Sequence, residues 1–240
     1  MPRPKKDTDP AAWSEVFADA ELDRSRSIGP QVYNFVRLKI ILSELPSGTQ
    51  INEHWLANTL GVSRTPIREA YQKLVHDSLI ISQPQVGSIV APIDDKRVLE
   101  GMIIRRALES EVIQILCGRT EDPPGADLNV LDPILAVQKI AVERDDYVEF
   151  FKSDEAFHAK LSDLAGIPSA WRLAQSVKAH TDRARIQLMS SLPNRLQQAF
   201  EEHGQLIAAI RARDAGQAKE IISRHINSVF DALDAFPHKI

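Results

Sequence analysis

The 240-residue sequence has one cysteine, Cys117, and no apolar run long enough to cross a membrane. A single cysteine excludes an intramolecular disulfide and a zinc site built from several cysteines. A metal ion would therefore need histidine and carboxylate ligands. The basic start, MPRPKK, is not followed by the apolar stretch of a signal peptide. We therefore expect a cytoplasmic protein with no membrane partner.

A surplus of positive charge is also lacking, since the formal net charge is −4. The stretch 28–91 is almost neutral, with five lysine and arginine residues against four acidic residues. Phosphate binding depends on which cations face the nucleic acid. Any DNA binding must therefore come from the placement of a few cations.

Composition divides the chain into an arm and two domains. Residues 1–27 are rich in proline at the front and charged throughout, which is typical of a mobile arm. Within them, AAWSEVFADAEL has apolar residues at helical spacing, so a short docking helix is an alternative. Residues 28–92 mix helical and strand patterns, whereas residues 93–240 show helical periodicity.

The first domain is predicted to contain a pair of helices joined by a glycine turn. A helix over 29–43 precedes the pair, whose first member runs from the N-cap residue Asn52 to Leu60. Gly61 makes the turn at low steric cost. The second member has an inward apolar face formed by Ile67, Ala70, Tyr71 and Leu74. This pattern predicts a helix-turn-helix.

The outward face of the second helix carries two arginines. Arg64 and Arg68 are one turn apart, and Gln72 follows four residues later. Ser63 or Thr65 is the expected helix cap. Guanidinium groups in this position can bind guanine edges or phosphates.

Two strand-like runs follow, over 79–83 and 88–91, around a turn rich in proline and glycine. They complete a winged helix-turn-helix. As an alternative, the winged helix would bind another protein, and its arginines would form a solvated face without a role in DNA binding. The complete arrangement favours DNA binding.

Residues 29–92 resemble the N-terminal domain of the GntR family of bacterial transcription regulators. The resemblance rests on GVSRTPIREAYQKL and on the wing sequence GSIVAP. It implies that Arg64, Thr65 and Arg68 contact bases or phosphates, and that Gly87 lets the wing tip approach the minor groove. His54 stands where such proteins often have an arginine. The full set of predicted DNA-binding residues is Ser63, Arg64, Thr65, Arg68, Gln72, His54 and Gly87.

The second domain is predicted to be all-helical. Helical periodicity continues near 94–118, 127–143, 146–165, 168–190, 194–212 and 215–235, with turn-forming residues between the segments. No strand pattern interrupts them. The predicted fold class is therefore mostly α, with an N-terminal winged helix-turn-helix and a C-terminal helical bundle.

Histidines on three of these segments are the candidates for chemistry. Asp154 and His158 are four residues apart on one helix face, from which both can reach one ion. His203 and His225 lie on two other segments, each at the edge of an apolar stripe. Taken singly, such a histidine is more often a satisfied or exposed side chain. Together, the four residues could converge on a metal ion.

The motifs RRALE, DEAFHAKL and EEHGQLIAAIRARDAGQAKEIISRHI resemble the FadR-like branch of the GntR family, whose FCD-type effector domain is a helical bundle. The resemblance implies a divalent metal ion, with zinc, nickel and manganese all open. Its ligands would be Asp154, His158, His203 and His225. An arginine on the first helix of this domain would bind the carboxylate of a small organic acid. Arg105 fits that place best, and Arg106 is the alternative.

The expected protein is a homodimeric, ligand-responsive regulator whose winged helices bind the half-sites of a pseudo-palindromic operator in double-stranded DNA. Binding of the effector would bias the spacing or freedom of the two heads. One alternative is a sensor in which the metal ion itself is the signal. Another is a metal-dependent hydrolase, with Glu155, Glu201 or Glu202 as its base. A DNA-reading module would be unexplained in an enzyme, so we expect a regulator.

Overall fold

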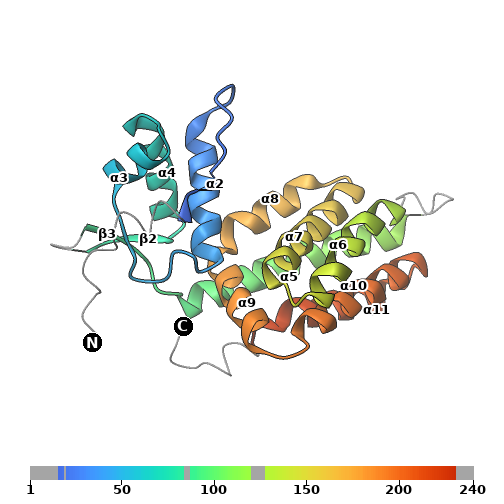
Figure 1. The fold of residues 1–240 in the computed structure, drawn as a ribbon. Helices are drawn as coiled ribbons and strands as arrows, with labels where there is room; N and C mark the ends of the chain where they lie inside the picture. The colour runs from blue at the N-terminus through green and yellow to red at the C-terminus, as the bar shows by residue number, and fades with distance from the viewer. Residues whose placement is uncertain (1–15, 19, 84–86, 120–127, 231–240) are drawn as a thin grey trace. The chain divides into compact units, whose positions relative to one another are not determined.

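The chain folds into two units, Met1–Ile93 and Asp94–Ile240, which we call the N-terminal unit and the C-terminal unit. The computed structural model describes residues 16–18, 20–83, 87–119 and 128–230 (Figure 1).

The N-terminal unit combines helices with a small antiparallel sheet. Its elements are α2 (Ile28–Ile41), β1 (Gln50–Ile51), α3 (Glu53–Thr59), α4 (Arg64–His76), β2 (Ile80–Gln83) and β3 (Gly87–Val90). The strands pair in the order β1-β3-β2. The predicted helices and hairpin are present, and the winged helix-turn-helix is confirmed. The sequence gives no signal for β1, because two residues are too few to show an alternating pattern.

Local signals explain how α3 and α4 are placed. Asn52 caps α3, because its side chain accepts hydrogen bonds from two backbone N–H groups of the first turn. Gly61 turns the chain with a φ of 61°, a backbone conformation that glycine adopts readily. On α4, the Tyr71 hydroxyl donates a hydrogen bond to the carbonyl oxygen of Ile51. This bond ties the helix pair to the sheet.

The described part of residues 1–27 contacts the rest of the N-terminal unit. The Phe17 ring is buried, and its centroid lies 5.6 Å from that of Phe35 and 5.9 Å from that of Trp55. Arg24 donates a 3.2 Å hydrogen bond to the carbonyl oxygen of Gly61. These contacts hold the end of the expected arm on the helix-turn-helix. Half of the expected docking helix, residues 11–15 and 19, lies outside the described residues.

The C-terminal unit is a helical bundle (Figure 1). Its elements are α5 (Asp95–Gly118), the 3₁₀ helix η1 (Leu128–Leu131), α6 (Asp132–Glu143), α7 (Tyr147–Leu164), α8 (Pro168–Val177), α9 (Ala179–Ser191), α10 (Arg195–Arg211) and α11 (Ala215–Asn227). Helix α5 packs against α8, α9 and α11, and α7 packs against α6 and α8. No strand occurs among the described residues of this unit, which confirms the all-helical prediction.

The prediction of one helix over 168–190 is wrong. The segment forms two helices, α8 and α9, which part at Lys178. Lys178 is fully buried, and its ammonium group donates hydrogen bonds to the carboxylates of Glu155 and Asp182. Close packing on α5 is possible because Gly101 has no side chain, since a Cβ there would lie 2.8 Å from a backbone oxygen of α8. Periodicity alone does not reveal a break set by such contacts.

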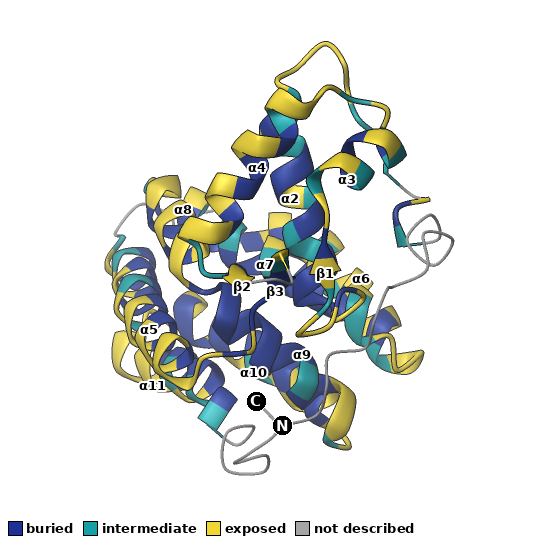
Figure 2. Ribbon diagram, turned by 90° about the vertical axis from the view of Figure 1, so that its left-hand side faces the viewer, coloured by how far each residue is buried: buried dark blue, intermediate teal, exposed yellow. Residues whose placement is uncertain are grey.

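Figure 2 shows that buried positions run along the helices of the C-terminal unit. Many of the side chains buried there are charged or titratable. They include Arg105, Glu109, Asp154, His158, Lys178, His180, Asp182, Arg183, Arg185, Arg195, His203 and His225. Within the described part of the N-terminal unit, Lys39 is the one buried charged residue. None of the helices in the described ranges is long and apolar enough to cross a membrane.

Candidate DNA-binding face and candidate metal centre

Helix α4 has an exposed polar face opposite its buried one. Arg64, Thr65, Arg68 and Gln72 are all exposed on it. Ser63 occupies the N-cap position with extended backbone, although its side chain makes no capping hydrogen bond. The face therefore presents two guanidinium groups and two further hydrogen-bonding side chains to solvent.

Side chains from α3 orient both arginines. Arg64 Nη2 lies 3.1 Å from His54 Nδ1, and Arg68 Nε lies 3.5 Å from Glu53 Oε2. Exposed contacts of this kind contribute little to stability. They restrict the directions that the guanidinium groups take, and both groups remain accessible. Sequence reasoning identified His54 but not its contact with Arg64.

The wing requires glycine at its turn. Gly87 opens β3 with a φ of 99°, in the region that favours glycine. A Cβ there would lie 3.6 Å from Gln50 Nε2, which is an ordinary contact. The backbone angle, rather than the space, therefore explains the glycine. Residues 84–86 of the wing lie outside the described residues.

Three helices of the C-terminal unit bring the four predicted metal ligands together. Asp154 and His158 lie on α7, His203 on α10 and His225 on α11. One ligand atom from each residue lies within 4.8 Å of the others. All four side chains are buried, with residue exposures between 0% and 4%. Asp154 and His158 meet because their four-residue spacing places them on one face of α7.

The three imidazoles point at the same carboxylate oxygen. Asp154 Oδ1 lies 3.7 Å from Nε2 of His158, 3.4 Å from Nε2 of His203 and 3.6 Å from Nε2 of His225. Two ligand atoms on a tetrahedral ion, each about 2.1 Å from it, would be about 3.4 Å apart. Asp154 Oδ1 and the Nε2 atoms of His158 and His203 are buried without a hydrogen-bond partner. The donor set thus fits a divalent metal ion.

A second layer of polar groups contacts the opposite nitrogen of each imidazole. Nδ1 of His203 lies 2.8 Å from Gln138 Oε1, and Nδ1 of His225 lies 2.8 Å from Glu202 Oε2. Nδ1 of His158 lies 2.6 Å from Glu109 Oε2, although the oxygen is off the N–H direction of a good hydrogen bond. At His203 and His225 such partners place the proton on Nδ1 and leave the Nε2 lone pair available for a metal ion. At His158, burial lowers the pKa, but the nearby carboxylates, Glu109 foremost, raise it above its usual value, so metal binding there would release a proton.

The surroundings also set the charge of the ligands. Burial opposes ionisation of Asp154, but Arg185, whose Nη2 lies 2.6 Å from Asp154 Oδ2, holds the pKa of Asp154 well below its usual value. Burial lowers the pKa of His203 to about 3. An ionised carboxylate and a neutral imidazole are the forms that coordinate metal ions. Arg185 was missed in the sequence reasoning.

The two candidate effector-binding arginines have different environments. Arg105 is 1% exposed and donates through Nε to Glu109, which itself contacts the metal ligand His158. Arg106 is half-buried and donates through Nη1 to Asn227 on α11, 3.0 Å away. The structure therefore brings Arg105, and not Arg106, next to the candidate metal centre. Burial opposes ionisation of Glu109, but Arg105 strongly lowers its pKa.

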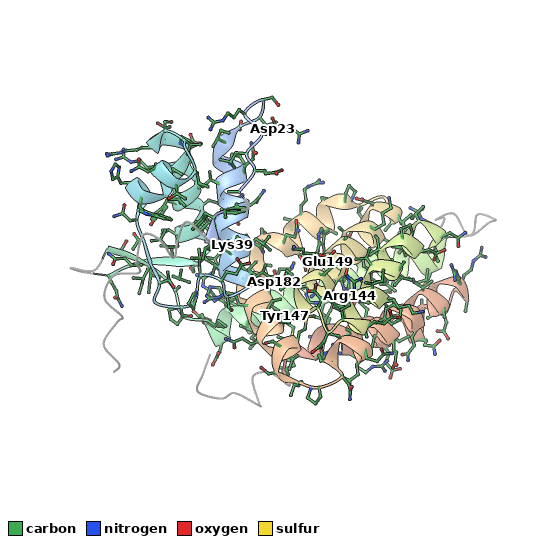
Figure 3. All side chains as sticks on the ribbon, in the orientation of Figure 1. Asp23, Lys39, Arg144, Tyr147, Glu149 and Asp182 are labelled. Carbon is green, nitrogen blue, oxygen red and sulfur yellow. The ribbon has the colours of Figure 1, made fainter. Side chains whose placement is uncertain are left out.

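A second group of buried charges adjoins the first. Nζ of Lys178 lies 2.6 Å from Glu155 and 2.7 Å from Asp182, which is labelled in Figure 3. Arg185 Nη1 lies 3.5 Å from Glu155, so the same arginine contacts both groups. The available signal was the spacing of Lys178, Asp182 and Arg185, which repeats on one helix face. Charged residues at such spacing usually lie on a solvated face, so the spacing alone does not indicate burial.

The carboxylates considered as catalytic bases are engaged elsewhere. Glu155 accepts from Lys178, Glu201 accepts from Gln197 and Glu202 lies against His225. Each of the three thus already has a side-chain partner.

Two family descriptions match the chain. Residues 100–228 match the family described as "FCD domain", and residues 29–90 match "Bacterial regulatory proteins, gntR family". The first match spans the helices that carry the candidate metal ligands. The second spans α2 to β3, including the exposed face of α4.

The similar curated proteins are transcription regulators. The HTH-type transcriptional repressor RspR of Escherichia coli strain K12 is 28% identical over 217 residues, which are 90% of this chain and 92% of that protein. The gluconate operon transcriptional repressor of Bacillus subtilis strain 168 is 26% identical over 87% of this chain and 86% of that protein. Both alignments extend over both units.

Solved structures share the fold. E. coli McbR/YncC aligns with a TM-score of 0.75 and 20% sequence identity, covering 89% of this chain and 100% of that one. A GntR transcriptional regulator described as putative, from Rhodococcus sp. RHA1, aligns with a TM-score of 0.72 and 21% identity, covering 88% and 99%. At these identities the similarity establishes the fold alone.

Proposed function

Since the chain belongs to the GntR family of bacterial DNA-binding transcription regulators and carries an FCD domain, we propose that it is a homodimer controlled by a small organic acid bound at a metal ion. The matched families and named relatives are regulators and not enzymes. The observation that carries the proposal is the convergence of three imidazole Nε2 atoms on Asp154 Oδ1.

DNA recognition is assigned to the exposed face of α4. Arg64 and Arg68 would bind guanine edges or phosphates, with Ser63, Thr65 and Gln72 beside them. His54 would orient Arg64, from which its ring is 3.1 Å away. Two copies would bind the half-sites of a pseudo-palindromic operator in adjacent major grooves. Such a regulator would act in the cytoplasm.

The metal ion would be held by Asp154, His158, His203 and His225. Bound there, it would supply a Lewis-acidic position for an oxygen of the effector. Glu109, Gln138 and Glu202 keep the Nε2 lone pairs directed at the centre through their contacts with Nδ1.

An anionic effector is favoured by the arginines beside this centre. Nη2 of Arg105 is buried without a hydrogen-bond partner, and Nη1 of Arg185 has ion-pair contacts of 3.5 and 3.8 Å but no hydrogen bond. Each therefore has a donor to offer to a carboxylate, the group that suits a guanidinium best. Arg105 and Arg185 balance the charges of Glu109 and Asp154. A divalent cation would then leave an excess of positive charge that an organic acid offsets.

The DNA assignment is tested on an operator selected from a random-sequence library by the parent protein. We expect Arg64→Ala and Arg68→Ala each to weaken specific binding by about 1–3 kcal/mol. Lys73→Ala is the matched control, since Lys73 lies on the same helix but stacks over the Tyr33 ring 3.9 Å away. Parent-like affinity of both arginine variants in fluorescence anisotropy would remove α4 as the recognition helix.

The metal assignment is tested by elemental mass spectrometry of the purified chain. We expect about one ion per chain, with its identity read from the same spectrum, and loss of the ion in the double variant His203→Ala, His225→Ala. His180→Asn, a change at a buried histidine outside the cluster, should keep the ion. Stoichiometric metal in the double variant would reject the four-ligand centre.

The effector assignment is tested by calorimetry against a panel of organic acids. We expect Arg105→Met to lose the heat of binding while retaining the metal ion, and its neighbour variant Arg106→Met to keep both. A metal-loaded protein that binds no acid, but whose DNA affinity changes when metal is added, would instead establish the metal-sensing alternative.

A further inference from the structure

Helix α5 is apolar on the side that faces away from the bundle. Leu99, Ile103 and Ile104 are 40%, 45% and 40% exposed there. The same helix buries Val98 and Met102 against its neighbours. Neighbouring exposed apolar side chains of this kind often mark an interaction surface. We propose that two copies of this chain pair through the outward side of α5, an inference that rests on the proposed homodimer and names its contact surface.

The surface is a continuous stripe along the helix. We define the α5 stripe as Lys96, Leu99, Glu100, Ile103, Ile104, Ala107, Leu108 and Glu111. These residues are exposed, apart from Leu108, which is half-buried. With 3.6 residues per turn they occupy about half of the helix circumference. Helix α8, which packs on α5, adds Leu173 and Val177, at 58% and 37% exposure.

The stripe complements itself when two copies run antiparallel. A two-fold axis between positions 103 and 104 pairs each residue with the one at the mirrored position on the other copy, as a symmetric dimer requires. Ile103 then faces Ile104, and Leu99 faces Leu108. Glu100 faces Ala107, one turn from Lys96 on its own helix. The apolar residues thus meet at the centre of the contact.

The charges at the ends of the stripe identify the occupant as a second copy. In the same register Lys96 of one copy faces Glu111 of the other at both ends. Neither residue has an ion-pair partner within the part of the chain that the structure describes. A different partner would need an apolar stripe with an acid and a base at those two places. This chain already has both, at the required separation.

The outward positions of α11 and α6 differ from the α5 stripe. On α11 the outward positions include the charged residues Lys219, Glu220 and Arg224. On α6 the exposed large apolar residues are Val137 and Ile140. Ile140, at 47% exposure, is therefore a matched control for Ile103.

The first test measures the mass of the full chain by analytical ultracentrifugation over a range of concentrations. We expect the parent to be a dimer and Ile103→Glu, Ile104→Glu to weaken dimerisation at least about 100-fold, because four carboxylates would meet at the axis. Ile140→Glu should dimerise like the parent. Circular dichroism should show that the parent and both variants are folded, because the substituted residues are exposed. A folded double variant that dimerises like the parent would overturn the proposal.

The second test reverses the end charges. Lys96→Glu and Glu111→Lys should each weaken the homodimer, and the double variant should restore it. An equimolar mixture of the two single variants should form heterodimers, because each contact then joins a glutamate to a lysine. Dimerisation that is equally strong in the parent and in all three variants would contradict the antiparallel register.

Both tests are made without DNA, so their outcome is separable from that of the proposed function. Dimers that respond as expected but bind no operator would leave this surface in place and reject the regulator mechanism. Operator binding by a protein whose dimerisation is unaffected by the stripe variants would reject this surface and leave the regulator mechanism in place.

Discussion

The two units distribute charge in opposite ways. In the N-terminal unit Arg64 and Arg68 are exposed on α4, and the core is built from apolar side chains. In the C-terminal unit Arg105, Lys178 and Arg185 are buried, while the outward side of α5 is apolar. Burying a charge is costly unless it is paired and hydrogen-bonded. Removal of a cation should therefore cost the first unit little stability and the second unit much more.

The proposed function accounts for this difference. DNA would approach from outside, so the cations that bind it would need only a fixed direction in solvent. A metal ion and a small acid held in the bundle would be enclosed by helices, so the groups that bind them would have to be ionised in a dry interior. Opposite charges placed beside Asp154 and Glu109 keep both carboxylates ionised there.

The largest effect is expected from removing a buried cation. Lys178→Met should lower the free energy of unfolding of the C-terminal unit by about 3–5 kcal/mol, because Asp182 and Glu155 lose the ammonium group between them. Denaturant melts followed by circular dichroism measure the change. Arg64→Met is the matched control in the other unit and should leave stability within about 0.5 kcal/mol. Equal losses of stability in Lys178→Met and Arg64→Met would show that the two units do not differ in their response to loss of a cation.

Adding metal should sharpen the same contrast. At 100 times its dissociation constant, an ion bound to the native state adds about 2.7 kcal/mol of stability. That gain should occur in the C-terminal unit, which contains all four ligands, and be absent from the N-terminal unit. Hydrogen exchange, measured with and without a chelator, reports the stability of each unit separately. Protection that rises equally in both units would conflict with an ion held by Asp154 and the three histidines.

A moderate and equal effect is expected at the helix starts. Asn52 caps α3 in one unit and Asp94 caps α5 in the other, each accepting two backbone N–H bonds. Asn52→Ala and Asp94→Ala should each lower stability by about 1 kcal/mol. Thermal melts test both, with Asp94→Asn retaining the cap. Strongly unequal losses would mean that the units differ in more than their interiors.

The smallest effect is expected for an exposed ion pair. Arg68 and Glu53 are 3.5 Å apart, with side-chain exposures of 65% and 39%. Glu53→Gln should change the free energy of unfolding by less than about 0.5 kcal/mol. Operator binding should become slightly tighter, because a negative charge next to Arg68 is removed. A loss of stability above about 1 kcal/mol would show that the pair matters as much as the buried ones.

Much of the fold was predictable because its signals are local. The Asn52 cap, the Gly61 turn and the alternation in the hairpin each act within a few residues. The break at Lys178 was not predictable, because it depends on contacts with Glu155, which is distant in sequence. The two-residue strand β1 is likewise fixed by its pairing with β3 rather than by its own pattern.

Within the candidate site, the four ligands followed from spacing and resemblance, whereas their supports did not. Arg185, Gln138 and Glu202 touch the ligands from other helices. Nothing in their local sequence separates them from surface residues. The choice between Arg105 and Arg106 as the effector-binding residue also required the structure, because adjacent residues on a helix point about 100° apart.

The enclosure of the four ligands has a kinetic consequence. With Asp154, His158, His203 and His225 no more than 4% exposed, an ion held between them would be largely shielded from solvent. Its release would require α7, α10 and α11 to move apart, and such openings range from microseconds to seconds or longer. The residence time of the ion would then depend on local opening of the helices as well as on the strength of the metal–ligand bonds. An ion trapped in this way reports poorly on rapid changes in its free concentration, and serves better as a lasting part of the binding site.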